Sequence, residues 1–406
     1  MTSVTVAGVG GKFVTLDYSS SANVGLAQQL AAAITAGVDA GTIIPVADTG
    51  APLPTLPGGK TGEFIQTMNG ATFLPPGYNA VVVKAQDAVI FGSGDANEMV
   101  LSSKGDLTFF ASGASASGSI AAGGGNNRIV ISGSDTGNWL VTGGNGNDFI
   151  DAMGSGNDTI EAGKGHNGIV LGGGASFVQS SGDDTVLAGS GAATIAAIGK
   201  HHDLIYGGSG SLLFVGGAGP ATVLGGHGSV TVFGGDGTTF ASGGSDGNNL
   251  LMAGGGKATL LGGGNGDTLF AGGSQAQSLR AAGGSETLYA GFASGPDTLQ
   301  AGSGHNLLIA GFGNETLVAG TGSATMTGGF GNDIFTFIKG EAGGTDLVQN
   351  FIGGDKVDLS GYGPHAIADA LKTQHVVNGS VTITLTDNTK ITFAGISSLT
   401  HGDFVQ

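Results

Sequence analysis

A nine-residue repeat constrains the fold of this chain more than any other feature of its sequence. It reads Gly-Gly-x-Gly-x-Asp-x-U-x, where U is a large apolar residue, and its clearest copies are residues 143–151 and 328–336. Between them the period persists, but the Asp is often replaced. A three-residue strand joined to a six-residue Gly turn cannot bury its apolar side chain alone. We therefore expect the copies to stack around a continuous core.

Composition excludes several other classes of protein. The chain has 406 residues and 84 Gly, but Gly does not occur at every third position, which excludes collagen. Its hydrophobic share of 40% is too high for a disordered chain. The formal net charge of -17 argues against nucleic acid as a partner and against docking on anionic membranes. The longest apolar runs are too short to cross a membrane, so we expect no membrane insertion.

The pattern along the chain predicts four segments. Residues 1–79 are expected to form an N-terminal cap with a short hairpin, one helix at 21–36 and a Pro-rich linker. Residues 80–142 read as irregular opening coils, and residues 143–336 as the regular repeat solenoid. Residues 337–406 read as a C-terminal cap with a helix at 366–372 and a hairpin around 380–393. The predicted fold is all-β: a parallel β-roll or β-solenoid with a small N-terminal α+β cap and a C-terminal β module.

The acidic turns indicate a divalent cation. Calcium takes about six to eight oxygen ligands, and a Gly-x-Gly-x-Asp turn offers carbonyl oxygens and one carboxylate. Two such turns from successive coils could surround one ion. Asp203 and Asp267 hold the same position in weaker turns, and the alternative is that these Asp side chains only satisfy the turn backbone. The metal ligands that we predict are Asp148, Asp158, Asp184 and Asp333, with the turn glycines Gly144, Gly146, Gly154, Gly156, Gly329 and Gly331.

Residues 143–406 resemble the RTX (repeats-in-toxin) family, which Gram-negative bacteria export through type I secretion systems. The resemblance rests on the repeats and on an Asp-Phe ending at residues 403–404. It implies a parallel β-roll, turns that bind Ca²⁺, and an uncleaved C-terminal export signal. The first eleven residues lack the pattern of a Sec-type signal peptide. RTX proteases and lipases carry a catalytic domain before the repeats, and residues 1–142 match neither.

The outer face of the strands is unusually apolar. If the middle residue of each strand triplet faces the core, the third residue faces outward. Stacked coils would align these residues into rows, and a monomer seldom exposes a long apolar patch. Packing against another copy is one explanation, and burial within the same chain is the other. The third-position residues include Leu187, Tyr206, Val215, Leu224, Phe233, Met252, Leu261, Phe270, Tyr289, Ile309 and Val318.

Sequence patterns of enzymes are weak in this chain. Residues 243–247 match Gly-x-Ser-x-Gly, but the long strand and helix of a nucleophile elbow are missing. His201, His202 and Asp203 could bind zinc, although a turn surface is the better interpretation because no further ligands follow at suitable spacing.

Together these observations predict a secreted, non-enzymatic, calcium-binding structural solenoid of the bacterial cell surface, a biofilm matrix or an extracellular filament. It would be a self-associating homo-oligomer or filament. One alternative is an exported RTX enzyme or toxin with an unrecognised site in residues 1–142. The other is an adhesin that binds a cell-surface or matrix polysaccharide.

Overall fold

The computed structural model describes residues 2–18 and 21–405. Contacts between Cα atoms divide the chain into two compact units, residues 1–213 and residues 214–406. Each unit is described by itself.

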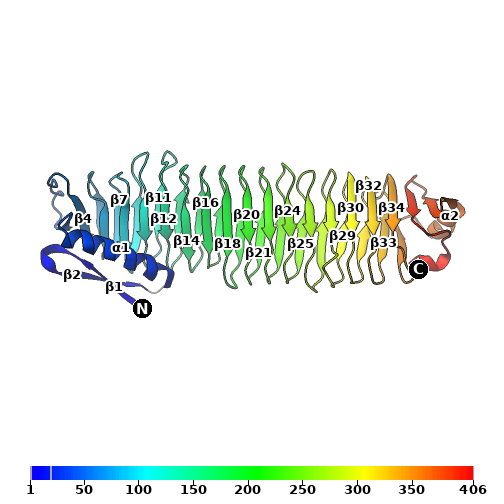
Figure 1. The fold of residues 1–406 in the computed structure, drawn as a ribbon, viewed down its shortest axis with the longest axis horizontal. Helices are drawn as coiled ribbons and strands as arrows, with labels where there is room; N and C mark the ends of the chain where they lie inside the picture. The colour runs from blue at the N-terminus through cyan, green and yellow to red at the C-terminus, as the bar shows by residue number, and fades with distance from the viewer. Residues whose placement is uncertain (1, 19–20, 406) are drawn as a thin grey trace. The chain divides into compact units, whose positions relative to one another are not determined.

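In the first unit the chain alternates between two parallel sheets (Figure 1). We call them the even-numbered and odd-numbered sheets after the numbers of most of their strands. The exception is β3, which pairs with β4 and so belongs to the even-numbered sheet. The even-numbered sheet contains β3 (Ile43–Ala47), β4 (Thr61–Gln66), β6 (Ala80–Val83), β8 (Glu98–Ser102), β10 (Gly118–Ala121), β12 (Trp139–Thr142), β14 (Thr159–Gly163), β16 (Ser176–Ser180) and β18 (Ala193–Ala197). The odd-numbered sheet contains β5 (Gly70–Phe73), β7 (Asp87–Phe91), β9 (Asp106–Phe110), β11 (Arg128–Ile131), β13 (Phe149–Ala152), β15 (Gly168–Leu171), β17 (Thr185–Leu187) and β19 (Asp203–Tyr206). The next strand, β20 (Leu212–Val215), contains the unit boundary.

The core of the first unit lies between the two sheets. Ile150 of β13 pairs in register with Ile129 and Ile169 of its neighbours, and all three are fully buried. Their flanking residues alternate outward, as the period of a strand requires. The expected all-β fold with a parallel solenoid of Gly-rich repeats is thereby confirmed.

An N-terminal hairpin and helix cover one side of this solenoid. β1 (Thr2–Ala7) and β2 (Phe13–Tyr18) pair antiparallel, with the 3-10 turn η1 (Val9–Gly11) between them, and α1 (Ser21–Asp39) follows. Leu30 and Ile34 of α1 pack in one buried cluster with Val82, Leu101 and Ala121 of the even-numbered sheet. The predicted helix is confirmed, and it lies along the outer face of the first coils (Figure 1).

Parallel pairing begins earlier in the chain than the Pro-rich linker predicted. β3, β4 and β5 fall inside residues 1–79, and β3 pairs with β4 in parallel register. Pro45 has no N–H to donate, and it is tolerated because β3 is an end strand with β4 as its one described partner. The other three prolines, Pro52, Pro54 and Pro57, lie in the loop between β3 and β4.

The second unit repeats the same alternation. Its odd-numbered sheet contains β21 (Ala221–Leu224), β23 (Thr239–Ser242), β25 (Ala258–Leu261), β27 (Gln277–Arg280), β29 (Thr298–Gln300), β31 (Thr316–Val318), β33 (Ile334–Ile338) and β35 (Lys356–Ser360). Its even-numbered sheet contains β22 (Val230–Phe233), β24 (Leu250–Met252), β26 (Thr268–Phe270), β28 (Thr287–Tyr289), β30 (His305–Ile309), β32 (Ser323–Thr327) and β34 (Thr345–Gln349). Leu269, Leu288 and Leu308 are buried between the sheets.

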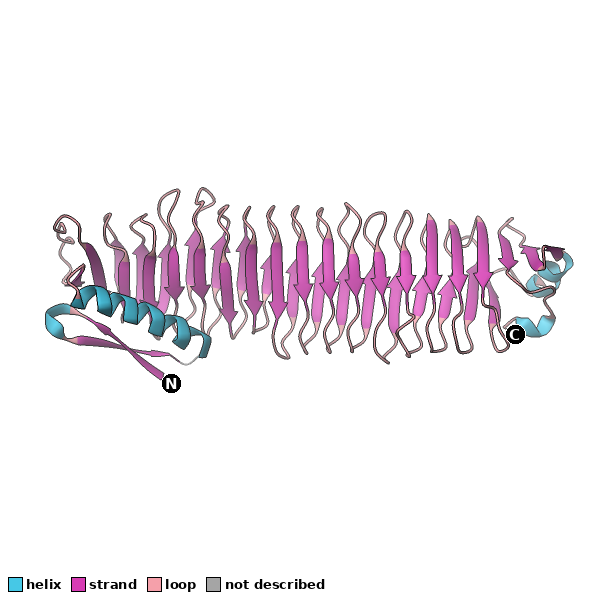
Figure 2. Cartoon of the chain, viewed as in Figure 1, coloured by secondary structure: helices cyan, strands magenta, loops and turns pink. Residues whose placement is uncertain are grey.

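A different arrangement ends the second unit (Figure 2). β38 (Lys390–Phe393) joins β34 in parallel, while β36 (His375–Val377) and β37 (Ser380–Thr384) continue antiparallel from it. The helix α2 (Ala366–Lys372) has the predicted bounds. The 3-10 turn η2 (His401–Asp403) precedes Phe404, which bridges to Val357. The predicted C-terminal helix and hairpin are therefore confirmed.

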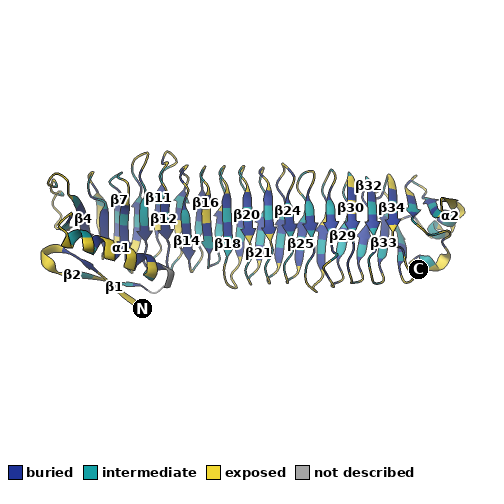
Figure 3. Ribbon diagram, in the orientation of Figure 1, coloured by how far each residue is buried: buried dark blue, intermediate teal, exposed yellow. Residues whose placement is uncertain are grey.

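The third residues of the strand triplets do face outward (Figure 3). Leu187 and Tyr206 in the first unit, and Val215 and Phe233 in the second, are about 40% exposed. Val318 is the exception, because it is only 8% exposed. Apolar side chains therefore remain partly accessible on the outer faces of both units.

Candidate calcium sites on the stacked turns

Many strands of the two sheets are entered through a turn that ends in a buried residue, and these residues stack from coil to coil. We call each of them a rung, and the stacked rungs of one edge a ladder. In the first unit, the turns that enter odd-numbered strands carry the rungs Asn127, Asp148, Asn167, Asp184 and Asp203, all no more than 3% exposed. The sequence folds in this way because the rung stands at the start of the strand, two residues before its core-facing middle residue, so both side chains fall on the same side.

A hydrogen bond joins each rung to the next coil. The backbone N–H of Asn127 donates to Asp148 Oδ1 over 2.7 Å, and the N–H of Asp148 donates to Asn167 Oδ1 over 2.8 Å. The N–H of Asn167 donates to Asp184 Oδ1 over 3.2 Å. These partners are 17–21 residues apart, so one coil contains two nonapeptides. Consecutive repeats therefore lie on opposite edges, and turns one full coil apart face each other.

Asp148 keeps one carboxylate oxygen free of hydrogen bonds. Its Oδ1 accepts both the N–H and the side-chain amide of Asn127, whereas Oδ2 is buried without a partner. Burial raises the pKa of Asp148 to about 6. A buried, unpaired carboxylate oxygen is costly, and a bound cation would satisfy it. Both rungs beside Asp148 are Asn, so this turn offers one carboxylate, with amide and backbone oxygens for the remaining ligands.

Asp184 and Asp203 form an acidic pair around one hydroxyl group. Ser180 Oγ lies 2.6 Å from Asp184 Oδ2 and also contacts Asp203 Oδ1. A serine hydroxyl has one proton and cannot donate to both carboxylates. Either one carboxyl is protonated, or a cation lies between them. Burial raises the pKa of both groups, that of Asp203 to about 6. Asp203, which the sequence placed in a weaker turn, is thus the direct partner of Asp184.

Asp158 lies on the opposite edge, in the turn that enters β14. Its Oδ1 accepts the backbone N–H of Trp139 over 2.9 Å, and the following rung is Ser176. Burial, with the nearby charge of Asp135, raises the pKa of Asp158 to about 6. The structure therefore places Asp148 and Asp158 on different ladders, where they cannot share an ion.

In the second unit Asp333 belongs to a run of four consecutive acidic rungs. Their backbone bonds follow the same direction: Glu315 N–H donates to Asp333 Oδ1, and Asp333 N–H to Asp355 Oδ1, both over 2.9 Å. Asp297 accepts the N–H of Gln277 in the same way. Glu315 Oε2, Asp333 Oδ2 and Asp297 Oδ2 are buried without partners. Burial and contact with Asp333 raise the pKa of Glu315.

Sequence reasoning missed Asp297, Glu315 and Asp355. One signal could have revealed the first two: an acidic residue stands directly before a Thr-Leu strand start, as it also does at Asp267 and Glu286. These two are neighbouring rungs of the even-numbered ladder, where burial raises the pKa of Glu286 to about 7 and leaves its Oε1 without a partner.

The predicted turn glycines lie where a coil stacks closely on its neighbour. Gly331 has φ +128°, and a Cβ there would overlap the carbonyl oxygen of Gly313 in the coil beside it. Gly144, Gly146 and Gly329 also have positive φ, whereas Gly154 and Gly156 are excluded from substitution by crowding alone. Close stacking keeps carbonyl oxygens and rung carboxylates within the same turn region, which is the donor set that calcium requires.

Among the described residues, no three acidic or histidine side chains converge as a ready-made metal site. Any ion held by these ladders would therefore need backbone carbonyl oxygens in addition to one or two carboxylates. Oxygen donors alone, with no sulfur and no imidazole among the rungs, suit a hard cation such as calcium. The rungs with unpaired oxygens are the positions that would hold it.

The histidine group noted in the sequence does not come together as a site. Asp203 is a buried rung, whereas His201 and His202 are exposed on the same turn. Instead, the half-buried Asp183 lies 3.5 Å from His166 Nδ1 and 3.9 Å from His201 Nδ1.

Comparison with known proteins agrees with this geometry. A family model described as the RTX calcium-binding nonapeptide repeat (4 copies) matches residues 142–178, 293–326 and 309–336. These ranges include the turns of Asp148 and Asp158 and the acidic rungs from Asp297 to Asp333. No curated protein matches the chain. The stacked turns at these positions match RTX nonapeptide repeats, which bind calcium, so the chain contains repeats of this kind.

Proposed function

We propose that this chain is a secreted structural protein whose solenoid is completed by calcium and then associates with other copies. The observation that carries the proposal is the set of buried carboxylate oxygens without partners on the ladders of both units. Burial of so many carboxylates costs free energy unless each one is protonated or bound to a cation.

Calcium would therefore act as a folding ligand. The oxygens of one site come from turns about one coil apart, such as Glu315 and Asp333, which are 18 residues apart. They meet only when the coils stack, so the free energy of calcium binding becomes free energy of folding. In a cytoplasm with little free calcium the acidic chain would remain largely unfolded, and it would become ordered outside the cell.

The outer apolar rows support self-association. In the second unit, Phe233, Met252, Phe270, Tyr289 and Ile309 pair in unbroken register across five strands of the even-numbered sheet. Phe270 and Tyr289 make an edge contact, with ring centroids 5.5 Å apart. A continuous partly exposed apolar row is typical of an interaction surface. We therefore propose a homo-oligomer or filament of the cell surface or of an extracellular matrix.

We also propose that the protein is exported. RTX-repeat proteins are typically exported and bind calcium outside the cell, and none of the described helices is long and apolar enough to cross a membrane. Residues 337–406 would carry the export signal. Phe404 of the Asp-Phe ending is 2% exposed. The signal would therefore be recognised before folding buries it.

We propose no catalytic role. The acidic groups with the most strongly raised pKa values are buried inside the solenoid, where a substrate would not reach them. Glu63, the prime example in residues 1–142, is fully buried, and burial raises its pKa to about 8. The enzyme and adhesin alternatives both remain open to test.

The test combines folding with assembly. Circular dichroism and light scattering of the full chain, measured with excess calcium and with chelator, should show a gain of β-structure followed by a rise in particle mass. A chain whose spectrum ignores chelator would refute the folding role. A protein that stays monomeric with calcium at all concentrations would refute assembly and leave the folding role standing.

A further inference from the structure

A groove crosses the outer face of the odd-numbered sheet in the second unit. It has a volume of about 530 Å³ and spans the ends of β25, β27, β29 and β31 and the turn after β33. Leu261, Arg280 and Gln300 stand side by side in register on β25, β27 and β29. The groove therefore runs across the strands and along the stack of coils.

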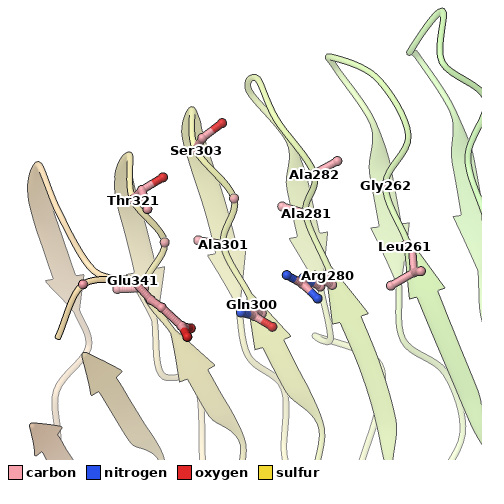
Figure 4. A pocket seen from close by; sticks show the side chains of 14 residues that line it. Leu261, Gly262, Arg280, Ala281, Ala282, Gln300, Ala301, Ser303, Thr321 and Glu341 are labelled. Carbon is pink, nitrogen blue, oxygen red and sulfur yellow. The ribbon is translucent and has the colours of Figure 1, made fainter. Parts of the chain in front are cut away.

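Small residues form its floor, and a longer strand closes one end. Ala281, Ala301 and Ala319 follow the strand ends and are nearly buried, so they leave open space above them. β33 continues to Ile338, and a tight turn begins there, because the N–H of Glu341 donates to the Ile338 carbonyl over 3.0 Å. This turn brings Glu341 to the end of the groove (Figure 4).

Three polar side chains along the groove lack partners. Within the described part of the chain, Arg280, Gln300 and Glu341 form no side-chain hydrogen bond or ion pair, and Figure 4 shows them in one row above the strands. Arg280 is one of two arginines in a chain of net charge -17. A guanidinium without a partner has the paired N–H donors that suit a carboxylate or phosphate ligand.

We propose that this groove binds an acidic oligosaccharide. Arg280 would hold a sugar carboxylate through its paired N–H donors. The Gln300 amide, the Glu341 carboxylate and the hydroxyls of Ser303 and Thr321 would hydrogen bond sugar hydroxyls. A shallow groove with a small-residue floor and polar groups along its length suits an extended, hydroxyl-rich chain.

A peptide fits the groove less well. β27 and β29 are already hydrogen bonded on both sides, so no free strand edge exists for an added strand. The lining offers Ala, Gly, Ser and Thr, and it lacks the deep apolar pockets that would anchor peptide side chains. The proposal does not depend on calcium binding by the ladders or on self-association. A negative result at the groove would therefore leave both of those proposals unaffected.

The test is a calorimetric titration of the calcium-loaded full chain with a hexasaccharide of alternating glucuronate and N-acetylglucosamine. A neutral glucose hexasaccharide is the control ligand. We expect the acidic ligand to bind, the neutral ligand to bind more weakly, and Arg280→Gln to lower the affinity at least about tenfold. The matched control is Arg128→Gln, because this second arginine lies on the first unit against Phe149, and it should leave binding unchanged.

A second variant separates the groove from an isolated charge. Ser303→Trp fills the groove from its exposed side and keeps Arg280, so it should also abolish binding. Absence of binding to the parent chain, equal affinity in Arg280→Gln, or full affinity in Ser303→Trp would each overturn the proposal. A poly-glutamate peptide that binds through Arg280 as tightly as the saccharide would also overturn it and would reassign the groove to acidic peptides.

Discussion

At the scale of single residues, the stacking of coils makes glycine indispensable at particular turn positions. We predict that Gly331→Ala destabilises the protein by at least about 2 kcal/mol, because a Cβ at φ +128° is strained and overlaps the Gly313 carbonyl oxygen. The control is Gly353→Ala, because its Cβ would meet nothing within 4 Å. Thermal denaturation in calcium measures both variants, and equal melting temperatures would contradict the close stacking.

Single rungs should also set calcium affinity. We predict that Asp333→Asn lowers the calcium affinity of the intact chain about tenfold or more, because Asp333 supplies an unpaired carboxylate oxygen between two other acidic rungs. Asp246→Asn is the matched control, since this Asp is exposed on a turn. Calcium titration followed by calorimetry measures the difference. If both variants bind calcium like the parent, the acidic run of the second unit is not a calcium site.

At the scale of elements, the N-terminal helix and hairpin rest on a sheet that contains a buried acid. Glu63 of β4 stands in register with Ala80, which belongs to the cluster beneath α1, and neither of its carboxylate oxygens has a partner. Ionisation of Glu63 is therefore expected to destabilise the cover over β4.

This arrangement predicts a pH dependence. The pKa of Glu63 is about 8 in the folded chain and 4.5 as the model value, so its contribution to stability is complete below about pH 4 and lost as the pH rises through 8. Glu63→Gln should therefore melt at a higher temperature than the parent near pH 9 and at a similar temperature near pH 4. Glu161→Gln, a half-exposed strand position, should not show this pattern.

The elements also show which parts of the fold could be predicted from sequence. The helix after residue 20, the helix at 366–372 and the C-terminal hairpin have local signals, and each was found. The early strands β3 to β5 were missed because Pro45 suggested a linker, and only a missing neighbour makes Pro tolerable there. The sequence motif predicts the turn of Asp333. Its partners Glu315 and Asp355 could not be predicted, because they follow from the number of residues in one coil, which only the stacked structure shows.

At the scale of the whole molecule, protons and calcium should compete for the same interior oxygens. Burial raises the pKa values of Asp148, Asp158, Asp203 and Asp297 to about 6, and those of Glu286 and Asp346 to about 7. The folded, metal-free chain therefore binds more protons than the unfolded chain between about pH 4 and pH 7. Its stability should fall as the pH rises through this window.

Calcium should remove this trend. In excess calcium the carboxylates are deprotonated in both the folded and the unfolded chain above about pH 5, so stability should change little from about pH 5 to about pH 7, whereas in chelator it should fall. Thermal melts at about pH 5 and about pH 7, with calcium and with chelator, measure the four values. If the melting temperature changes with pH in the same way in calcium and in chelator, the buried carboxyls do not bind the metal.

The ladder bonds all point the same way along the chain. In the pairs from Asn127 with Asp148 to Asp333 with Asp355, the earlier coil donates the N–H and the later coil supplies the acceptor. The rung bonds therefore have one direction: the rung N–H of each coil is satisfied by the rung of the coil that follows it. Loss of coils from the carboxyl end would leave a rung N–H without its acceptor, whereas loss from the amino end would leave a rung oxygen without its donor. A coil that folds beside a carboxyl-terminal neighbour already in place therefore finds its rung acceptor in position.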